Sequence, residues 1–532
     1  MNRLLLPTRS DRSDPPTLSG SQAAAVSVVS FAAAVGVGHL VAALVSPMSS
    51  PYRAVADAVV RLAPAWLVEF GKTLTLPGLG VGKADKVGLL VGVGLVLVLI
   101  AVIAGRASRA SARPARITLN VVGVIGLVAV ATAPTFGPLD LLAPFVALGV
   151  GSACLRWLHA QALAVVWADG DPASSGTGRR NVLVSGLAIG AGAITSGVLG
   201  NLIGSWPELG DAGAGVLDRL RPTRPAPPIP PGADFVADGT PTFLTANRDF
   251  YRIDTALSVP SQSAQDWTVR VHGLVRDELS LTYADLLKRP LVERPITLAC
   301  VSNEVGGSLI STANFIGVDL REVLLEAGIR SGADQLFSTS RDGWTAGTPL
   351  DVLLEPGRGA MLALGMNGEP LPPEHGYPVR MVVPGLYGYV SATKWLADLE
   401  VTTFDARQAY WLERGWSRLA PIKTESRIDK PSGFAPVRSG EVVVAGIAWA
   451  QHRGISSVEV RLDDGAWIPA QLATEVNSDT WRMWRAVVRA APGRHTVWAR
   501  ATDGTGVVQT EEEAPPAPDG ASGYPGVEFI AL

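Results

Sequence analysis

The sequence has little charge and almost no cysteine. Only 17% of its 532 residues are charged, 47% are hydrophobic, and the mean hydropathy is +0.26. This composition excludes an intrinsically disordered chain and indicates that part of the protein lies in lipid. The two cysteines, Cys154 and Cys300, cannot build a disulfide framework. The net charge of -3 provides no basic field for nucleic acid, so we expect no nucleic-acid partner.

Charge is sparse over five apolar stretches in the N-terminal part of the chain. Each is close to the ~20 residues that a helix needs to cross a bilayer, so we expect an α-helical transmembrane bundle in residues 1–209. The five predicted spans cover about residues 21–45, 87–105, 117–136, 139–160 and 182–203. The weaker stretch 55–70 is interrupted by charged residues and Pro64, which favours an interfacial helix over a sixth span.

Arginines gather in the short loops at one end of the predicted spans. They are Arg3, Arg9, Arg12, Arg106, Arg109, Arg113, Arg116, Arg179 and Arg180. Short cytoplasmic loops are enriched in Lys and Arg, so we expect a multi-pass protein of the cell membrane with a cytoplasmic N-terminus. Everything after residue 203 is then extracytoplasmic. The adjacent Arg179 and Arg180 also resemble a twin-arginine export signal, which moves folded, cofactor-loaded proteins; an ordinary charge anchor is the alternative, and both interpretations stay open.

Proline and strand patterns divide the rest of the chain. Residues 210–234 are rich in proline, which favours a stiff linker that holds the soluble part off the membrane. Strand-like and helical runs alternate through 235–405, which is typical of an α+β domain. After a connector at 406–439, residues 440–532 show only strand patterns, with a hairpin turn at Asp464-Gly465. They predict a β-sandwich without an inter-sheet disulfide, because this region has no cysteine.

Cys300 ends a strand-like run, Pro295-Ile-Thr-Leu-Ala-Cys300, and opens a polar, glycine-rich turn at 301–307. The thiol is therefore expected at the mouth of a strand. Most cysteines without a disulfide are small buried core residues; the alternatives are a nucleophile or a ligand to a soft or high-valent metal. No second cysteine or histidine cluster completes a zinc site, so a metal on Cys300 needs a cofactor that brings its other ligands.

Residues 235–405 resemble the molybdopterin domain of the sulfite oxidase family. The segment Thr297-Leu-Ala-Cys-Val-Ser-Asn303 matches that family's molybdenum-cysteine turn. Further matching segments follow in order at 245–252, 267–273, 340–345, 366–372 and 375–384, then Tyr387-Gly-Tyr and Lys394-Trp395. The sandwich is similar to the family's immunoglobulin-like C-terminal dimerisation domain. The resemblance covers about 300 of 532 residues and leaves the predicted helices outside it.

The resemblance implies a molybdenum-molybdopterin cofactor and the residues that bind it. It makes Cys300 the catalytic residue and the protein ligand to molybdenum. The cofactor-binding positions that it implies are Asn247, Phe250, Tyr251, Cys300, Thr339, His375, Arg380, Thr393 and Lys394. Guanidinium and ammonium donors suit a buried phosphate. Each of these residues alone could be an ordinary surface or core residue, and their order beside Cys300 is what favours a site.

The sequence departs from the family where the family binds an oxyanion substrate. Sulfite oxidases place arginines there, whereas this chain has Glu304 after the cysteine turn and Ala246 before the first matching asparagine. An acidic side chain at that place repels sulfite. The arginines that could compensate are Arg248, Arg252 and Arg341. The substrate is therefore left unassigned.

Haem is not expected. His39 and His159 lie at different depths of their predicted spans, so they cannot share a haem, and the chain has no Cys-x-x-Cys-His. Electrons are then expected to leave to another protein or to a quinone.

Together these features predict a membrane-anchored, extracytoplasmic molybdenum oxidoreductase that performs two-electron oxygen-atom transfer on a small molecule. The expected partners are that substrate, membrane lipid, an electron acceptor and a second copy bound through the C-terminal domain. The rival interpretation is a membrane-anchored binding or assembly protein that keeps the fold without the cofactor. A transporter is disfavoured, because no acidic pair lies inside the predicted spans.

Overall fold

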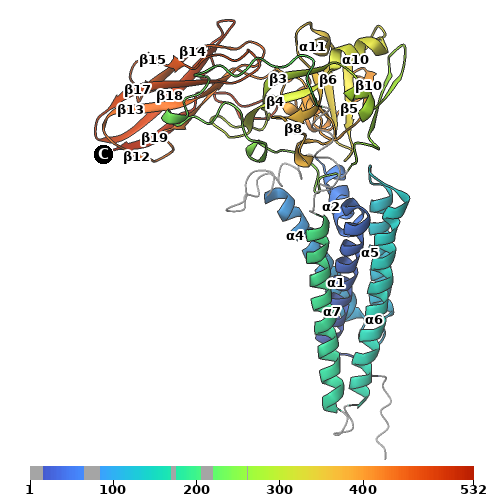
Figure 1. Ribbon diagram of the computed structural model, residues 1–532. Helices are drawn as coiled ribbons and strands as arrows, with labels where there is room; N and C mark the ends of the chain where they lie inside the picture. The colour runs from blue at the N-terminus through green and yellow to red at the C-terminus, as the bar shows by residue number, and fades with distance from the viewer. Residues whose placement is uncertain (1–15, 65–83, 169–174, 205–219, 261) are drawn as a thin grey trace, which may run out of the picture. The chain divides into compact units, whose positions relative to one another are not determined.

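The computed structural model describes residues 16–64, 84–168, 175–204, 220–260 and 262–532. The chain divides into two compact units (Figure 1). The first comprises Met1–Pro207 with Ala256–Ser258, and the second comprises Glu208–Thr255 with Val259–Leu532. The first unit is helical, and the second is built mostly from strands.

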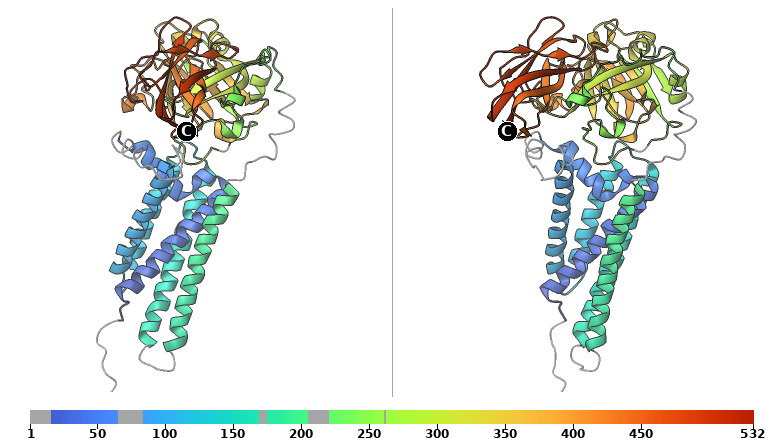
Figure 2. Two further views of the ribbon diagram at one scale, coloured as in Figure 1. Left: turned by 90° about the vertical axis from the view of Figure 1, so that its left-hand side faces the viewer. Right: turned by 60° about the vertical axis from the view of Figure 1, so that its left-hand side comes forward.

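Among the described residues of the first unit, five helices are long and apolar enough to cross a membrane, and each overlaps one predicted span. They are α1 (Gly20–Val45), α4 (Ala84–Ala107), α5 (Arg113–Ala131), α6 (Leu142–Ala168) and α7 (Ser175–Gly204). Figure 2 shows them side by side, with α1 packed against α4, α6 and α7. Ser19 and Gln22 form a capping box that starts α1. Gly36 allows α7 to approach, because a Cβ there would lie 2.3 Å from the carbonyl oxygen of Ala193.

Shorter helices lie between these long ones. They are η1 (Pro47–Ser49), α2 (Pro51–Leu62) and η2 (Pro138–Leu141). Helix α2 occupies the first part of the stretch predicted as interfacial, and residues 65–70 lie outside the described part of the chain. The charges that interrupt this stretch include Asp57 and Arg61, which form an ion pair of 3.0 Å one helical turn apart.

The two histidines of this unit bond to protein groups. His159 lies 2.6 Å through Nε2 from the carbonyl oxygen of Ser108. His39 contacts Ser50 Oγ at 3.1 Å and Asn201 Oδ1 at 3.3 Å. Each ring therefore ties one apolar helix to a neighbouring segment.

Two sheets form the first part of the second unit. One has the order β3-β4-β7-β8, with β9 also paired to β7, and the other has the order β2-β1-β10-β5-β6. The first sheet consists of β3 (Leu291–Ala299), β4 (Ile310–Asp319), β7 (Met361–Met366), β8 (Glu369–Pro370) and β9 (Arg380–Val382). The second consists of β1 (Thr268–Gly273), β2 (Leu279–Thr282), β5 (Gln335–Ser340), β6 (Thr345–Pro349) and β10 (Leu396–Thr402).

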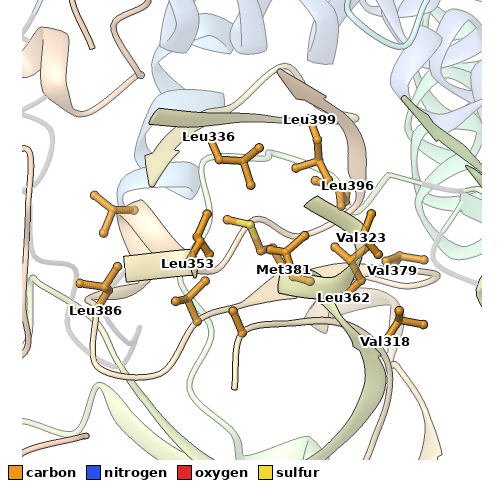
Figure 3. Close-up of a cluster of buried hydrophobic side chains, with 14 of the residues drawn as sticks. Val318, Val323, Leu336, Leu353, Leu362, Val379, Met381, Leu386, Leu396 and Leu399 are labelled. Atoms are coloured by element: carbon orange, nitrogen blue, oxygen red, sulfur yellow. The ribbon is translucent and has the colours of Figure 1, made fainter. Parts of the chain in front are cut away.

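Short helices connect these strands and cover the core. The α-helices are α9 (Tyr283–Leu287), α10 (Leu320–Ala327), α11 (Leu350–Leu354) and α12 (Gly388–Ser391). The 3₁₀ turns are η3 (Val236–Asp238), η4 (Asn247–Asp249), η5 (Pro373–His375) and η6 (Leu412–Arg414). Figure 3 shows the core between them, where Leu336, Leu362, Met381 and Leu399 are fully buried. Burial of such side chains contributes roughly 1.5–3 kcal/mol each.

The C-terminal part of the second unit consists of two further sheets that share one apolar core. One contains β11 (Glu425–Lys430), β13 (Gly440–Trp449), β16 (Gln471–Leu472) and β17 (Arg482–Ala490). The other contains β12 (Pro436–Val437), β14 (Ile455–Leu462), β15 (Ile468–Pro469), β18 (Gly493–Asp503) and β19 (Gly526–Ala531). Strands β14 and β15 pair antiparallel across Asp464-Gly465, which confirms the predicted hairpin.

The sandwich begins earlier than the sequence predicts. Strand β11 lies inside the predicted connector 406–439, yet it pairs antiparallel with β13 along most of its length. It was not predicted because its buried positions include the polar residues Glu425 and Ser426, which hide the strand alternation.

The proline-rich segment is packed, so the predicted free-standing spacer is wrong for its described part. The N–H groups of Thr223 and Arg224 both donate to the carbonyl oxygen of Leu291, at 2.8 and 3.1 Å. Glu293 makes two further hydrogen bonds with this segment. Its N–H donates to the carbonyl oxygen of Arg224, and its carboxylate accepts the N–H of Ala226. Proline tolerates such an edge position because it needs no ladder hydrogen bond there. Residues 205–219 of the predicted linker lie outside the described residues.

Glu425 gives the second unit a measurable dependence on pH. It is buried, and burial raises the pKa of its carboxyl group from 4.5 to about 8, against the attraction of Lys423. Between these two values the folded state keeps a proton that the unfolded chain releases, so stability falls as pH rises through this window. We expect Glu425→Gln to melt like the native protein near pH 4.5 and at a higher temperature near pH 8.

The measurement is the melting temperature of the full chain in detergent at pH 4.5 to 8. Glu441→Gln is the control, because Glu441 is exposed on the same sheet and pairs with Arg489 at 3.6 Å. Parallel melting curves for the native and Glu425→Gln proteins across this range would contradict the prediction.

Candidate functional site

Cys300 is the first residue after β3, at the start of the turn that leads to β4. Its N–H donates to the carbonyl oxygen of Leu309 at 3.0 Å, and its carbonyl oxygen accepts the N–H of Asn303 at 3.1 Å. These two bonds close the turn at 300–309. The thiol therefore stands at the end of a strand, in the position that the sequence predicts, and it is buried.

Asn303 and Gly307 fix the shape of this turn. The Oδ1 atom of Asn303 accepts the N–H of Leu309 at 2.8 Å. A Cβ on Gly307 would lie 2.6 Å from the same oxygen, so only glycine fits there. The Nδ2 group of Asn303 is buried without a hydrogen-bond partner among the described residues, so a donor is left available at the turn.

Four of the predicted residues come together beside the first sheet. Phe250 packs against Tyr251 with ring centroids 5.4 Å apart and against the edge of His375 at 5.4 Å. Arg380, on β9, lies over the ring of Phe315 at 5.9 Å. Desolvation raises the pKa of Tyr251, with a further contribution from Cys300 and an opposing one from Arg380.

His375 has an unused hydrogen-bond acceptor, Nδ1, in this cluster. Its Nε2 lies 2.9 Å from the carbonyl oxygen of Asn247, which requires the proton to be on Nε2. Burial, followed by the positive charges of Arg380 and Lys394, lowers the pKa of His375 to about 4, so the ring is neutral at pH 7. The Nδ1 atom is buried and unpartnered among the described residues. A group that binds here must donate a hydrogen bond to it.

Arg380 presents a donor. It is almost fully buried, and Nη1 donates to the carbonyl oxygen of His375 at 3.2 Å. Burial lowers the pKa of Arg380 to about 10, and its Nε is buried without a hydrogen-bond partner in the described part of the chain. A buried guanidinium with an unused N–H is costly unless an acceptor, most favourably an anion, binds it.

Lys394 stands next to this pair but is already bonded. Its Nζ donates to Asp254 Oδ2 at 3.1 Å and to the carbonyl oxygen of Glu374 at 3.2 Å. Burial lowers the pKa of Lys394 to about 8, although Asp254 opposes this shift. Gly376, at φ +108, allows the approach, because a Cβ there would lie 3.0 Å from Lys394 Cα. One proton of the ammonium group is left for a ligand.

Asp254 and Asp342 are charged residues of this region that the sequence analysis missed. Asp254 accepts from Lys394 and, at 2.8 Å, from Nε of Arg252. Asp342 is buried, and burial raises its pKa, with a further contribution from Asp254. Asp254 lies just beyond the matching segment 245–252. The only feature of the sequence that could have pointed to it is that it follows two basic residues.

The remaining predicted residues hold the surrounding loops. Asn247 uses its whole amide: Nδ2 donates to Met366 O and Glu369, and Oδ1 accepts from Asn367. The hydroxyl of Thr393 bonds to Ser338 Oγ at 2.7 Å. Thr339 lies on β5, where its strand partners are Asp398 and Thr345. The predicted role of these three residues in cofactor binding stays a prediction.

The arginines considered for an oxyanion are engaged or exposed. Arg248 is exposed and pairs with Asp249 at 3.3 Å, and Arg252 pairs with Asp254. Arg341 is also exposed. Glu304 points its charge toward solvent, since it is exposed on the turn after Cys300. None of these contacts builds an anion site at the thiol.

Among the described residues, no group of three or more His, Cys, Asp or Glu side chains is arranged to hold a metal ion. Cys300 therefore belongs to no all-protein metal site in this part of the chain. A metal at the thiol has to arrive with ligands of its own.

Residues 256–411 match the family described as the oxidoreductase molybdopterin binding domain. Mitochondrial sulfite oxidase of Rattus norvegicus is 30% identical, over 52% of this chain and 59% of that protein. Sulfite oxidase of Gallus gallus is 29% identical, over 54% and 71%. NADH nitrate reductase of Spinacia oleracea is 33% identical, over 29% and 19%. The matched region spans only 59 to 62% of the mammalian relatives.

Among solved structures, the sulfane dehydrogenase SoxCD from Paracoccus pantotrophus is similar with a TM-score of 0.49 and 23% sequence identity. That similarity covers 56% of this chain and 85% of the other.

The matching domain and the cysteine turn at the end of β3 define a molybdopterin-binding oxidoreductase. Residues 256–411 are therefore a domain of the molybdopterin-binding oxidoreductase type, and the chain is similar to sulfite oxidases over about half of its length.

The residues present fit a molybdopterin. A phosphorylated pterin carries anionic oxygens and ring N–H groups, and the cluster offers the unused donor of Arg380, the remaining proton of Lys394 and the bare acceptor of His375. Asn303 adds an unused donor beside the thiol. The unused hydrogen-bonding capacity of these groups matches both the polarity and the charge of such a ligand.

Proposed function

We propose that this chain is a membrane-anchored, extracytoplasmic oxidoreductase that uses a molybdenum-molybdopterin cofactor for two-electron oxygen-atom transfer on a small molecule. The observation that carries the proposal is the buried donor of Arg380 beside the bare acceptor of His375, in a domain that also presents Cys300 at a strand end. Such groups are costly to bury unless a ligand binds them.

The residues would divide the work as follows. Cys300 would bind molybdenum through its thiolate, and Arg380 and Lys394 would hold the phosphate. His375 would accept a pterin N–H, with its tautomer fixed by the carbonyl of Asn247. Phe250 would keep the His375 ring in place, and Tyr251 would stack on Phe250 beside it. When bound, the cofactor supplies the two-electron redox chemistry.

The membrane location and the partners are part of the same proposal. The five apolar helices support an anchor by their length and composition. The two-sheet C-terminal part supports an immunoglobulin-like sandwich that could join two copies, and electrons would pass to another protein or a quinone. The proposal does not include a haem.

Metal analysis tests the function directly. The full chain, purified from a host that makes molybdopterin, should contain close to one molybdenum per chain and should reduce or oxidise redox dyes with sulfite, sulfoxides or N-oxides. Less than about a tenth of a molybdenum per chain would instead support the cofactor-free binding or assembly protein.

Export is a separate prediction. Arg179 and Arg180 lie near the start of α7, and a twin-arginine receptor reads the guanidinium pair, whereas the positive-inside bias needs only charge. Replacing both arginines with lysine should leave the first four spans inserted but retain residues 235–532 in the cytoplasm. Protease added to spheroplasts measures this: digestion equal to that of the native protein would make the pair a charge anchor.

A further inference from the structure

The strand that carries Cys300 depends on the C-terminal sandwich for one of its edges. Strand β3 ends its sheet, and within that sheet it pairs only with β4. Along its other edge, Asn477 Nδ2 donates to the carbonyl oxygen of Pro295 at 3.1 Å. The N–H of Thr297 donates to the carbonyl oxygen of Asp479 at 3.0 Å, and Trp481 N–H donates to the Thr297 hydroxyl at 2.7 Å. The part of this edge next to Cys300 is thereby covered, while Thr223 and Arg224 cover the part at Leu291.

Arg427 continues this contact to the cysteine turn. It lies on β11, and its Nη1 donates to the carbonyl oxygen of Gly307 at 3.2 Å. Its Nε donates to Asp429 Oδ1 at 2.8 Å, which fixes the plane of the guanidinium. The side chain is only 13% exposed, so water competes little for these bonds. Pro525 also lies near the turn, since a Cβ added to Gly306 would be 3.8 Å from Pro525 Cβ.

The bond from Arg427 to Gly307 affects how firmly the Cys300 turn is held. The turn at 300–309 is tied to itself through Cys300, Asn303 and Leu309, and the bond to Gly307 ties it to a different domain. A hydrogen bond from a charged donor is stronger than a neutral one and is directional when the donor is a planar guanidinium. Losing it would free the glycine-rich half of the turn.

We propose that Arg427 is a positioning residue that holds the Cys300 turn closed, which makes the sandwich a structural part of the cofactor site as well as a possible interface between copies. The proposal rests on the proposed function in one respect, which is that Cys300 binds the cofactor. The closure of the turn can be tested without any cofactor.

The test measures alkylation of Cys300 in the full chain, purified in detergent from a host that cannot make molybdopterin. A Cys154→Ser background leaves one thiol, and mass spectrometry follows its reaction with iodoacetamide. We expect Arg427→Ala to react about tenfold faster, because a buried hydrogen bond from a charged group is lost. Arg427→Lys should fall between the two, since an ammonium group keeps the charge but lacks the fork.

Arg482→Ala is the matched control. Arg482 also bonds to backbone carbonyls, of Ala473 at 3.0 Å and Ile455 at 2.7 Å, but within the sandwich. Its loss should leave the alkylation rate unchanged. The double variant Arg427→Ala with Asp429→Asn removes the unpaired carboxylate, so a stable protein is available if the single variant does not fold.

Equal rates for the Arg427 variants and the Arg482 control would overturn the proposal. In molybdenum-loaded protein, the same Arg427 variants should keep their metal and change the electron paramagnetic resonance signal of Mo(V). Absence of molybdenum from the native protein would count against the proposed function, whereas the alkylation result would still decide the role of Arg427.

Discussion

Cys300→Ser is expected to abolish turnover while leaving the chain folded and the pterin bound. A hydroxyl is a poor ligand for a metal that selects thiolate, and it is not ionised near pH 7. Serine is close to cysteine in size, so the backbone bonds from residue 300 to Leu309 and Asn303 can persist. Turnover with redox dyes, pterin content after release and the melting temperature measure the three parts of this expectation.

Cys154→Ser provides the control. Cys154 lies on α6 in the helical unit, so its loss should change none of these three quantities. Activity of Cys300→Ser equal to that of the native protein would remove the thiol from the mechanism. A protein that loses its pterin together with its activity would give Cys300 a larger share of cofactor binding than we propose.

Arg380→Ala is expected to lower cofactor occupancy about tenfold or more when the cofactor is limiting. The substitution removes a charge-assisted partner of a buried phosphate, at a cost of roughly 1.5–3 kcal/mol. Arg380 is held inside the cluster by bonds from Nη1 to His375 O and from Nη2 to Ala392 O, and its Nε has no partner among the described residues. Pterin and molybdenum per chain, measured after expression at low molybdate, report the effect.

Two further variants serve as comparisons for Arg380→Ala. Lys394→Ala should act in the same direction but more weakly, because Asp254 already takes up much of the ammonium charge. Arg358→Ala should leave occupancy unchanged, since Arg358 is a largely buried arginine of the same domain that pairs with Glu355 and donates to Pro384 O. If Arg380→Ala and Lys394→Ala both carry a full complement of pterin, the assignment of the phosphate site is wrong.

The position of Cys300 could be predicted because its signal is local. An apolar run followed at once by a polar, glycine-rich segment specifies a strand end and a turn, and Gly307 sits where no side chain fits. The contacts of Arg427 and Asp254 could not be predicted in this way. Each joins residues more than a hundred positions apart, and a single sequence contains no pattern that pairs them.

The errors at the domain boundaries have a physical cause. Prolines in 220–231 indicate an extended chain correctly, but extension does not distinguish a free spacer from a segment bonded to Leu291. Strand β11 was not predicted because two of its buried residues, Glu425 and Ser426, count as polar in a sequence pattern. Burial of polar groups at interfaces between domains is decided by tertiary structure and not by alternation.

The edge of β3 that faces away from β4 determines when the site can exist during synthesis. Thr223 and Arg224, about seventy residues before β3, cover the first part of this edge, and Asp479 and Trp481, nearly two hundred residues after it, cover the part next to Cys300. Contacts of such separation form late, because a long loop must close first. A ribosome-bound chain that ends before the sandwich leaves the part of this edge next to Cys300 uncovered. If the proposed cofactor binds at Cys300, we expect its insertion to follow synthesis of the sandwich.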